Sequence, residues 1–285
     1  VKKNINYLKR NNWSKISKND FFSSSSCKIK KYTNLKNQKW TKKLFNIKNF
    51  VTIVTGSSRS IGLKIAEGFY EYGAKVIRID LNLKKHKLYK FDDYIIDLTK
   101  EKLVDRCVNE IKHKYGRIDV LINNAGVTTN STNFYDEKIL KKTLSVNLIA
   151  AYNLSNKVCK IMSKRKKGSI INITSLAAER GFIGNPSYQV SKAGLKQLTK
   201  ALACDWGHKN IRINNVCPGY IKTPMTLRSF KNSKLKKNRD MRMILKRWGE
   251  PKDLVGPCIF LASDSSSYIT GSDIFVDGGW LTKGM

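Results

Sequence analysis

Residues 188–192, with the sequence YQVSK, place a tyrosine and a lysine four positions apart, on one face of a helix. An ammonium group beside a phenol favours the phenolate and lowers the tyrosine pKa from its ordinary value of about 10. Such a tyrosine can take a proton from an alcohol, or return one to a ketone, near neutral pH. Because Y-x-x-x-K also recurs by chance in a lysine-rich chain, the alternative is a packed tyrosine beside a solvated lysine. The elements upstream decide between the two interpretations.

The first of these elements is a glycine-bearing turn. Residues 50–55 (FVTIVT) are a β-branched apolar run that predicts a buried strand, and residues 63–72 have helical spacing. Strand, glycine turn and helix is the arrangement of a dinucleotide site, where the backbone approaches the pyrophosphate and the helix N-terminus supplies free N–H groups. The predicted cofactor contacts in this turn are Gly56, Ser58, Arg59, Ser60, Ile61 and Gly62.

The end of the next strand bears on the choice of cofactor. Residues 75–80 predict a second strand that ends at Asp80. A carboxylate there accepts hydrogen bonds from both hydroxyls of the adenosine ribose and repels a 2′-phosphate, which favours NAD. Arg59, Lys84 and Lys85 favour the opposite, because a guanidinium in the turn could hold a 2′-phosphate. We give Asp80 more weight and predict NAD, with NADP as the alternative; Asp80 could also be an ordinary strand-ending acid.

Strand and helix patterns alternate along the rest of the chain. Further strands are predicted at residues 94–97, 118–122, 169–174, 211–217 and 274–276, and further helices at 100–115, 137–164, 186–208, 229–247 and 253–262. The connection between residues 80 and 94 is too short for a full crossover helix, so we expect a loop. This alternation predicts an α/β fold, a single Rossmann-type, doubly wound parallel sheet of about seven strands with helices on both faces.

Several polar or small residues stand at the ends of these elements. Asp97 and Leu98 end the third strand and could meet the adenine edge. The NNAG sequence at 123–126, with Asn124, Ala125 and Gly126, can pack over a flat ring and brace the neighbouring strand. Asn147 lies inside the 137–164 helix, where Asn is unfavourable, so a buried polar role is expected.

Taken together, these motifs resemble the short-chain dehydrogenase/reductase family over residues 44–282. The resemblance rests on the turn, the NNAG sequence, Asn147, Ser175, the Tyr188/Lys192 pair, Pro218-Gly219 and Thr223, in the family's order, and on the thirteen-residue step from Ser175 to Tyr188. The chain departs from the family at Ser60, where glycine is usual, and in the short connection after Asp80. Ser60 puts cofactor affinity in doubt, and the short connection puts the adenine pocket in doubt.

The resemblance implies reversible hydride transfer between a nicotinamide and a carbonyl or alcohol carbon. Tyr188 would be the general acid/base, and Lys192 would lower its pKa and hold the nicotinamide ribose. Ser175 would hydrogen-bond the substrate oxygen, and Asn147 would hold a water that links Lys192 to solvent. The nicotinamide would be held by Pro218, Gly219, the backbone of Ile221 and Thr223, which would fix the ring face. Relatives are usually tetramers, so we expect a homo-oligomer, a tetramer or a dimer, formed through the helices around Asn147 and Tyr188.

Residues 228–247 form a candidate substrate lid with nine Lys or Arg and one acid, Asp240. A lid this basic could attract a carboxylate or a phosphate, or could be a solvated face. Residues 44–47, 247–251 and 276–281 are similar to gluconate and deoxygluconate dehydrogenases, which favours a sugar acid or polyol. A 3-oxoacyl-carrier-protein reductase using NADPH is the alternative. A catalytically idle relative that binds nucleic acid or an anionic surface is the third possibility, which the complete Ser175/Tyr188/Lys192 set disfavours.

The whole composition sets the remaining expectations. The 285 residues carry a formal net charge of +34, and residues 1–50 hold 14 of the 55 Lys and Arg against a single acid, Asp20. Residues 1–43 are predicted to be a basic, disordered extension, or alternatively an organellar transit peptide, before a catalytic domain at 44–285. The six cysteines and three histidines show no metal-ligand spacing, and no apolar run could span a membrane. We therefore expect a cytoplasmic enzyme with an anionic small-molecule substrate, no metal, no membrane contact and no nucleic acid.

Overall fold

A computed structural model describes residues 43–129, 133 and 135–283. The described chain from Leu44 onward folds around one sheet of seven parallel strands in the order β3-β2-β1-β4-β5-β6-β7. The predicted fold class is confirmed, including the reversal of strand order between β1 and β4 that marks a doubly wound sheet. Residues 1–42, which make up nearly all of the predicted extension, lie outside the described residues.

The strands are β1 Val51–Thr55, β2 Lys75–Asp80, β3 Asp92–Ile95, β4 Val120–Asn123, β5 Gly168–Ile173, β6 Ile211–Pro218 and β7 Asp273–Val276. The α-helices are α4 Ser60–Glu71, α5 Glu101–Tyr115, α6 Glu137–Leu144, α7 Ala150–Arg165, α8 Pro186–Trp206, α9 Leu227–Lys231, α10 Ser233–Arg242 and α11 Val255–Ala262. A π-helical turn, η4 Ser145–Ile149, joins α6 to α7, and short 3-10 turns are η5 Leu176–Ala178, η6 Gly207–Lys209, η7 Pro251–Leu254 and η8 Asp264–Ser266.

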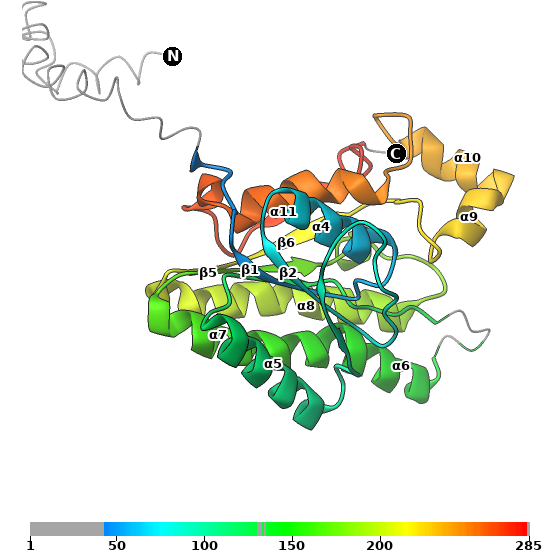
Figure 1. Ribbon diagram of the computed structural model, residues 1–285. Coiled ribbons are helices and arrows are strands. Elements are labelled where there is room, and N and C mark those ends of the chain that lie inside the picture. Colours follow the sequence, from blue (N-terminus) through cyan, green and yellow to red (C-terminus); the bar gives the residue numbers. More distant parts are fainter. Residues whose placement is uncertain (1–42, 130–132, 134, 284–285) are drawn as a thin grey trace, which may run out of the picture. The chain divides into compact units, whose positions relative to one another are not determined.

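Helices cover both faces of the sheet, and each face has its own apolar core (Figure 1). On one face α5, α7 and α8 contribute Val104, Leu154 and Leu202 to a cluster with the strand residues that point that way. On the other face α4 and α11 contribute Phe69 and Ile259. Strands buried on both faces explain the continuous apolar runs in the sequence, since neither face meets water.

Three element boundaries differ from those predicted. Strand β3 spans Asp92–Ile95 and not residues 94–97, so Asp97 lies beyond the strand. The single long helix predicted at 137–164 is α6 and α7 with the π-helical turn between them. The predicted helix at 229–247 ends at Arg242 in two pieces, α9 and α10.

The connection between β2 and β3 is a loop, as predicted from its length, and a buried arginine holds it. Arg78 on β2 is 2% exposed and donates to Asp93 Oδ1 at 2.8 Å and to the Lys84 carbonyl at 3.0 Å. Its guanidinium also lies 4.6 Å from the centre of the Phe91 ring. Because the pairing with Asp93 fixes the register of β3, this strand begins earlier than its apolar residues indicate.

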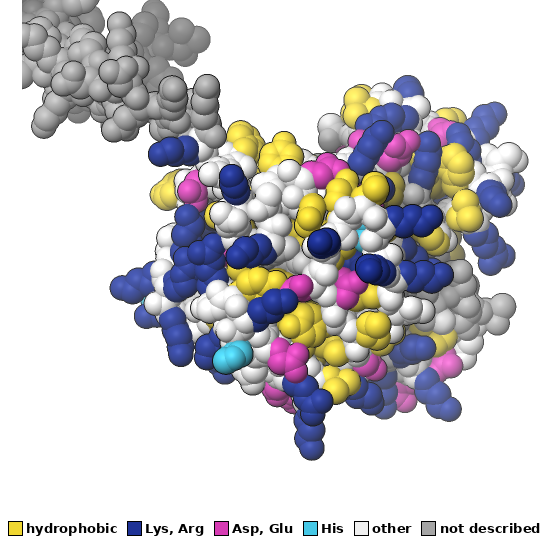
Figure 2. Space-filling view, viewed as in Figure 1, with side chains coloured by type: hydrophobic (Ala, Val, Ile, Leu, Met, Phe, Trp, Pro, Cys, Tyr) yellow, Lys and Arg dark blue, Asp and Glu magenta, His cyan; other side chains and the backbone are white. Residues whose placement is uncertain are grey.

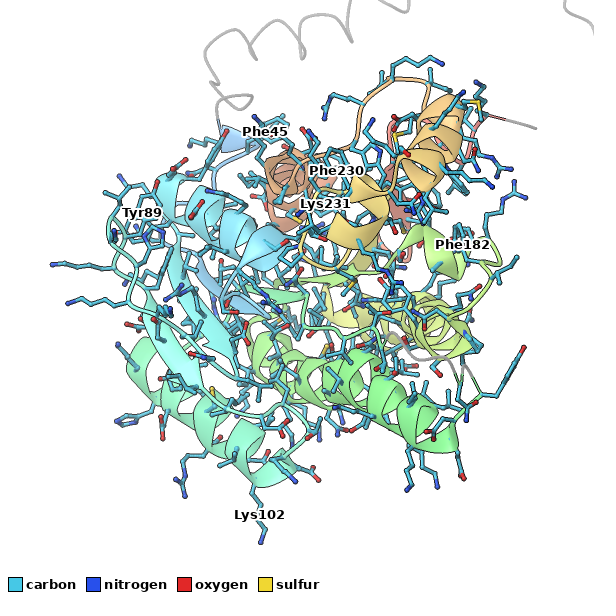
Figure 3. The ribbon with its side chains drawn as sticks, turned by 90° about the vertical axis from the view of Figure 1, so that its right-hand side faces the viewer. Phe45, Tyr89, Lys102, Phe182, Phe230 and Lys231 are labelled. Atoms are coloured by element: carbon cyan, nitrogen blue, oxygen red, sulfur yellow. The ribbon has the colours of Figure 1, made fainter. Side chains whose placement is uncertain are left out.

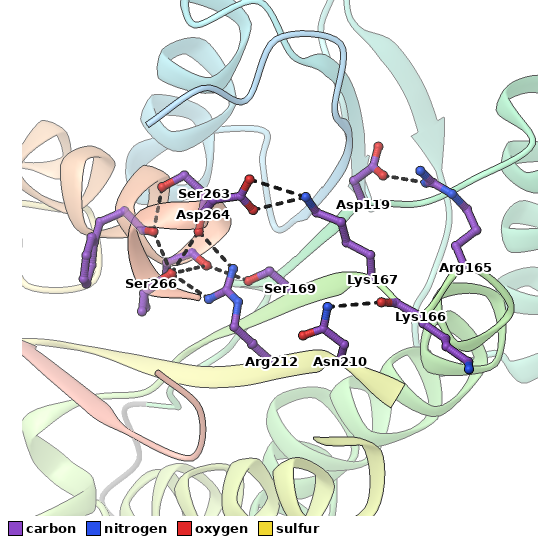
Figure 4. A network of polar contacts seen from close by, with 12 residues as sticks. Asp119, Arg165, Lys166, Lys167, Ser169, Asn210, Arg212, Ser263, Asp264 and Ser266 are labelled. Atoms are coloured by element: carbon purple, nitrogen blue, oxygen red, sulfur yellow. Dashed lines mark hydrogen bonds and ion pairs between the residues drawn. The ribbon is translucent and has the colours of Figure 1, made fainter. Parts of the chain in front are cut away.

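Side-chain contacts at the amino ends of the strands hold the edge of the sheet opposite the glycine turn (Figure 4). Asp119, just before β4, accepts from the Val51 backbone N–H at 2.9 Å and from Arg165 at 2.7 Å. Arg212 on β6 donates to Ser266 at 2.6 Å. Each of these groups is hydrogen-bonded within the protein, so the contacts at this edge stabilise the fold. No helix of the described residues is long and apolar enough to cross a membrane.

Candidate active site

The candidate site lies at the carboxyl ends of the parallel strands, where β1, β4, β5 and β6 each run into a turn that carries predicted site residues. Helix α8 brings Tyr188 and Lys192 to this edge. The start of α8 is well defined: Pro186 stands in its first turn, and the Asn185 side chain accepts from the Tyr188 backbone N–H at 3.3 Å. Tyr188 therefore sits in the first turn of a firmly capped helix.

Ser175 and Tyr188 come together as predicted. Ser175 follows β5 and caps η5, where its hydroxyl oxygen accepts from the Ala177 backbone N–H at 3.1 Å. That contact fixes the hydroxyl oxygen and leaves its hydrogen free to be donated. A hydrogen bond with Ser175 opposes the larger effect of burial, which raises the pKa of Tyr188.

The pKa of Tyr188 shifts in the direction opposite to the one predicted. Burial, the largest influence, raises the pKa of Tyr188, and only Ser175 opposes it. Lys192 Nζ lies 5.8 Å from the centre of the Tyr188 ring and donates to the Ile173 carbonyl at 2.7 Å. Burial also lowers the pKa of Lys192 itself to about 8. The prediction of a lowered tyrosine pKa was therefore wrong: burial outweighs the hydrogen bond with Ser175, and the pKa of Tyr188 is raised.

Asn147 is buried in the π-helical turn, 1% exposed. Its amide nitrogen donates to the Val127 carbonyl at 3.0 Å and to Ser191 Oγ at 2.9 Å, and its oxygen accepts from the Val127 N–H at 2.8 Å. Both amide hydrogens are thus used within the protein. A methyl group on Gly126 would lie 3.4 Å from Asn147 Oδ1 and 3.5 Å from Lys192 Nζ, so these two groups face the same small space.

The turn after β1 fits a dinucleotide. A Cβ on Gly62 would lie 2.2 Å from the Gly56 carbonyl oxygen, and Gly56 has a left-handed φ of 64°, so both positions require glycine. Helix α4 starts at Ser60 without a side-chain cap or an acid in its first turn, which leaves its N–H groups free for an anion. The hydroxyls of Ser57 and Ser60 are buried without a hydrogen-bond partner. Ser57, which the sequence did not single out, therefore joins the predicted contacts.

The residue that replaces glycine in this turn carries backbone strain. Ser60 has a φ of 57°, a left-handed conformation that costs a residue with a Cβ about 1 kcal/mol or more. We expect Ser60→Gly to stabilise the protein by about 1 kcal/mol, a rise in Tm of roughly 2–4 °C. Thermal unfolding checks this, with Ser58→Gly as the control in the same turn, since Ser58 has no left-handed φ. A lower Tm for Ser60→Gly would contradict the strain.

Asp80 and Arg59, the two residues predicted to select the cofactor, lie at the same turn. The Asp80 carboxylate accepts from the Ser58 N–H at 2.9 Å and from the Leu81 N–H at 2.7 Å, which orients it toward the turn. Arg59 precedes α4 and is exposed. Asp97 lies two residues beyond β3, where hydrogen bonds from Thr99 lower its pKa, and Leu98 packs against the core.

The NNAG segment braces the turn. Asn124 Nδ2 donates to the carbonyls of Thr55 and Gly56 at 3.0 and 2.9 Å, and the Ala125 N–H donates to Thr55 Oγ1 at 3.0 Å. Asn123 reaches across to Asn172 on β5 at 2.8 Å. The side chain of Asn124 is therefore used in fixing the strand ends, and only its backbone, Ala125 and Gly126 are available to a flat ring.

The segment after β6 holds the remaining predicted contacts. Pro218 ends the strand, and a Cβ on Gly219 would lie 2.6 Å from Asp277 Cα, so the close approach there requires glycine. Ile221 is buried and bridges to Gly249. Thr223 is oriented by Thr226, whose hydroxyl accepts from the Thr223 N–H at 3.1 Å.

Sequence reasoning missed the residues that orient the site from behind. Ser191 holds Asn147, Asn185 caps α8 and Thr226 orients Thr223. The Asn-Pro pair at 185–186 is a helix-start signal that could have been found. Ser191 and Thr226 could not, because their roles depend on contacts made only in the fold. No group of His, Cys, Asp or Glu in the described residues could hold a metal ion.

Three features together define a nicotinamide-dependent oxidoreductase. They are the parallel sheet, the uncapped helix at the glycine turn and the arrangement of Ser175, Tyr188 and Lys192. A family profile described as Enoyl-(Acyl carrier protein) reductase matches residues 56–281, and the chain belongs to the short-chain dehydrogenase/reductase family. It is an enzyme that acts on CH–OH or keto groups with NAD(P), which sets aside the idle binding protein considered from the sequence.

Individual relatives carry two kinds of name. A 3-oxoacyl-[acyl-carrier-protein] reductase of Thermotoga maritima is 35% identical, covering 80% of this chain and 96% of its own. A 2-dehydro-3-deoxy-D-gluconate 5-dehydrogenase of Pseudoalteromonas atlantica is 34% identical, covering 84% and 98%. A solved gluconate 5-dehydrogenase of Burkholderia cenocepacia, in complex with NADP and tartrate, has a TM-score of 0.80 at 29% identity over 84% of this chain and 98% of its own.

Proposed function

We propose that this enzyme oxidises the secondary alcohol of a sugar acid, or reduces the corresponding keto acid. The observation that carries the proposal is the charge of residues 228–247, which hold nine Lys or Arg and one acid, Asp240. Asp240 pairs with Lys236 and Asp253 pairs with Arg247, which leaves the other seven cations without an ion pair among the described residues. Figure 2 shows Lys and Arg side chains over α9 and α10. The relatives named for gluconate-type substrates support the same class of substrate.

The protein groups can move the proton in this reaction. A bound nicotinamide supplies the hydride acceptor for oxidation and the hydride donor for reduction. In reduction Tyr188 gives its hydroxyl proton to the carbonyl oxygen as that oxygen gains negative charge, and Ser175 donates a hydrogen bond to the same oxygen. In oxidation the ionised Tyr188 takes the proton back. Lys192 and Asn147, facing the space at Gly126, would return a proton to Tyr188 from solvent.

A direct test compares substrates. Purified protein is assayed with 5-keto-D-gluconate, with a neutral keto sugar of the same length and with a 3-oxoacyl thioester, following nicotinamide absorbance. The proposal expects kcat/KM for the keto acid to exceed that for the other two by at least tenfold. Fastest turnover of the thioester would make the chain a 3-oxoacyl-carrier-protein reductase, the second candidate, which the Thermotoga maritima relative favours.

We propose NAD as the preferred cofactor, because the Asp80 carboxylate is held at the turn where a 2′-phosphate would lie. Arg59 and the NADP in the solved neighbour favour the alternative. We expect Asp80→Asn to shift the ratio of Kd values toward NADP by about tenfold, or about 1.4 kcal/mol, since a carboxylate repels the 2′-phosphate. Fluorescence titration with NADH and NADPH checks this.

Arg59→Gln is the matched control for this titration and is expected to shift the ratio in the opposite direction. If the wild type binds NADPH more tightly and Asp80→Asn leaves the ratio within twofold, then Arg59 and not Asp80 sets the preference. That result would also strengthen the acyl-carrier candidate.

We propose a homo-oligomer, which is supported by an exposed apolar surface on the helices that the sequence analysis named as interfaces. Ile149, Tyr152 and Val190 are 50%, 46% and 54% exposed on η4, α7 and α8. We expect these side chains to be covered in a homo-oligomer, a dimer or tetramer. The proposal places the catalytic domain at 44–285, the substrate lid at 228–247 and the enzyme in the cytoplasm.

A further inference from the structure

An aromatic cluster lies between the lid and the catalytic edge of the sheet. Its members are Leu176, Phe182, Tyr220, Phe230, Met243, Trp248, Trp280 and Leu281. Leu176 follows Ser175 directly, and Phe182 is held to α8 because Gln189 accepts from its N–H and donates to its carbonyl, both at 2.7 Å. In Figure 3, Phe182 precedes α8 and Phe230 lies on α9. The cluster thus joins the residues around Ser175 and Tyr188 to the lid helices.

Two buried donors, one on Trp280 within the cluster and one on Arg239 beside it, have no hydrogen-bond partner. Among the buried side-chain nitrogens of the described residues, only Arg239 Nη1 and Trp280 Nε1 lack a hydrogen bond. Both side chains lie next to Tyr220. The Arg239 guanidinium is 4.6 Å from the centre of the Tyr220 ring, and the centre of the Trp280 ring is 5.7 Å from the same point. A buried donor left without an acceptor destabilises the fold, and more so if it is charged. Two such donors around one ring indicate a place built for an acceptor from outside the chain.

The surroundings keep Arg239 available. Trp248, the other tryptophan of the cluster, donates its Nε1–H to Asp240 at 2.7 Å, so the acid beside Arg239 is already in use. The Arg239 guanidinium stacks on Tyr220 and lies 5.9 Å from the Trp248 ring, which holds its plane in one orientation. A hollow opens beside the cluster, and its lining includes Tyr220, Ile244 and Gly279. Arg239 and Trp280 do not line it themselves and adjoin it through Tyr220.

We propose that Arg239, assisted by Trp280, binds the carboxylate of the substrate and thereby sets the preference for acids over neutral sugars. This inference rests on the proposed function and names the residues responsible for it. A planar guanidinium presents paired donors that match a carboxylate, and an indole N–H adds a third donor at a neighbouring angle. Neither residue takes part in the proton transfer; they position the substrate so that its alcohol or ketone meets Tyr188.

The first experiment measures binding without turnover. Wild-type protein is titrated with D-gluconate and with D-glucitol, the polyol that lacks the carboxylate, while tryptophan fluorescence is followed. We expect saturable binding of gluconate at least tenfold tighter than glucitol, and loss of that difference in Arg239→Met. Tighter binding of inorganic phosphate than of gluconate, or an unchanged difference in Arg239→Met, would overturn the assignment.

The second experiment separates this inference from the proposed function. With 5-keto-D-gluconate as substrate, Arg239→Met is expected to raise KM at least tenfold, and Trp280→Phe at least threefold. In both variants kcat should fall by a smaller factor than KM rises. Arg242→Met is the control, because Arg242 stacks on Trp280 at 5.4 Å from the same helix but is not one of the two unpartnered donors. If Arg239→Met turns over the keto acid with an unchanged KM, this inference is refuted and the proposed function is unaffected. Failure of the wild type to bind or turn over any acid refutes both.

Discussion

Tyr188→Phe should lower kcat/KM by at least a thousandfold while leaving cofactor binding within about threefold of the wild type. The substitution removes only the hydroxyl that exchanges a proton with the substrate oxygen, and the ring continues to fill its place in the first turn of α8. Nothing else in the described site offers a proton at that point: the Ser175 hydroxyl does not ionise near neutral pH, and Lys192 Nζ is bonded to the Ile173 carbonyl. Steady-state assays and NADH titration measure the two effects separately.

The control is Tyr268→Phe, which removes a fully exposed hydroxyl away from the site and should change neither quantity. The pH profile adds a second readout. Because burial raises the pKa of Tyr188, reduction should be supported at neutral pH and oxidation should increase toward alkaline pH. Retention of more than a tenth of wild-type turnover by Tyr188→Phe would remove Tyr188 from its assigned role.

Local signals explain why so much of the fold was predictable. The apolar run at 50–55, the glycines of the following turn and the helical spacing after them each predict one element without reference to the rest of the chain. Parallel order follows from their alternation, because a strand–helix–strand unit returns the second strand in the same direction. The glycine turn, the NNAG segment and Ser175 stand at the ends of strands, so predicting the strands also located most of the cofactor contacts, whereas Tyr188 and Lys192 reach the same edge from helix α8.

The failures share a different cause, which is contact between distant residues. The start of β3 depends on Arg78 meeting Asp93, and the π-helical turn places Asn147 against Val127 and Ser191. Neither contact changes the hydrophobic period of its own segment. The direction of the Tyr188 pKa was also out of reach, because the spacing of YQVSK shows that two groups share a helix face but not how deeply either is buried. The two unpartnered donors of the aromatic cluster come from segments forty residues apart and have no sequence signal.

Lys192→Met should abolish turnover and yet make the protein more stable at pH 7, by about 1–3 kcal/mol. Lys192 is 4% exposed, and the carbonyl of Ile173 is the one partner the structure gives its ammonium group. Burial lowers its pKa to about 8 from an ordinary 10.5, which means that the fold holds the charged form at a cost. Methionine has a similar length and no charge, so it removes that cost, although it leaves the Ile173 carbonyl without a donor.

The sign of the pH dependence distinguishes this explanation from a general gain in packing. Between about pH 8 and 10.5 the unfolded chain holds a proton on Lys192 that the folded chain has released, so wild-type stability should rise with pH across this window. The variant lacks that rise, and its advantage should therefore be largest below pH 8 and shrink toward pH 10.5. Urea unfolding at several pH values measures both proteins. Lys196→Met, one turn further along α8, is the matched control: Glu179 and Asp273 raise the pKa of Lys196, so its loss should destabilise the protein. An advantage for Lys192→Met that stays constant with pH would mean that the charge of Lys192 is not held at a cost in the folded protein.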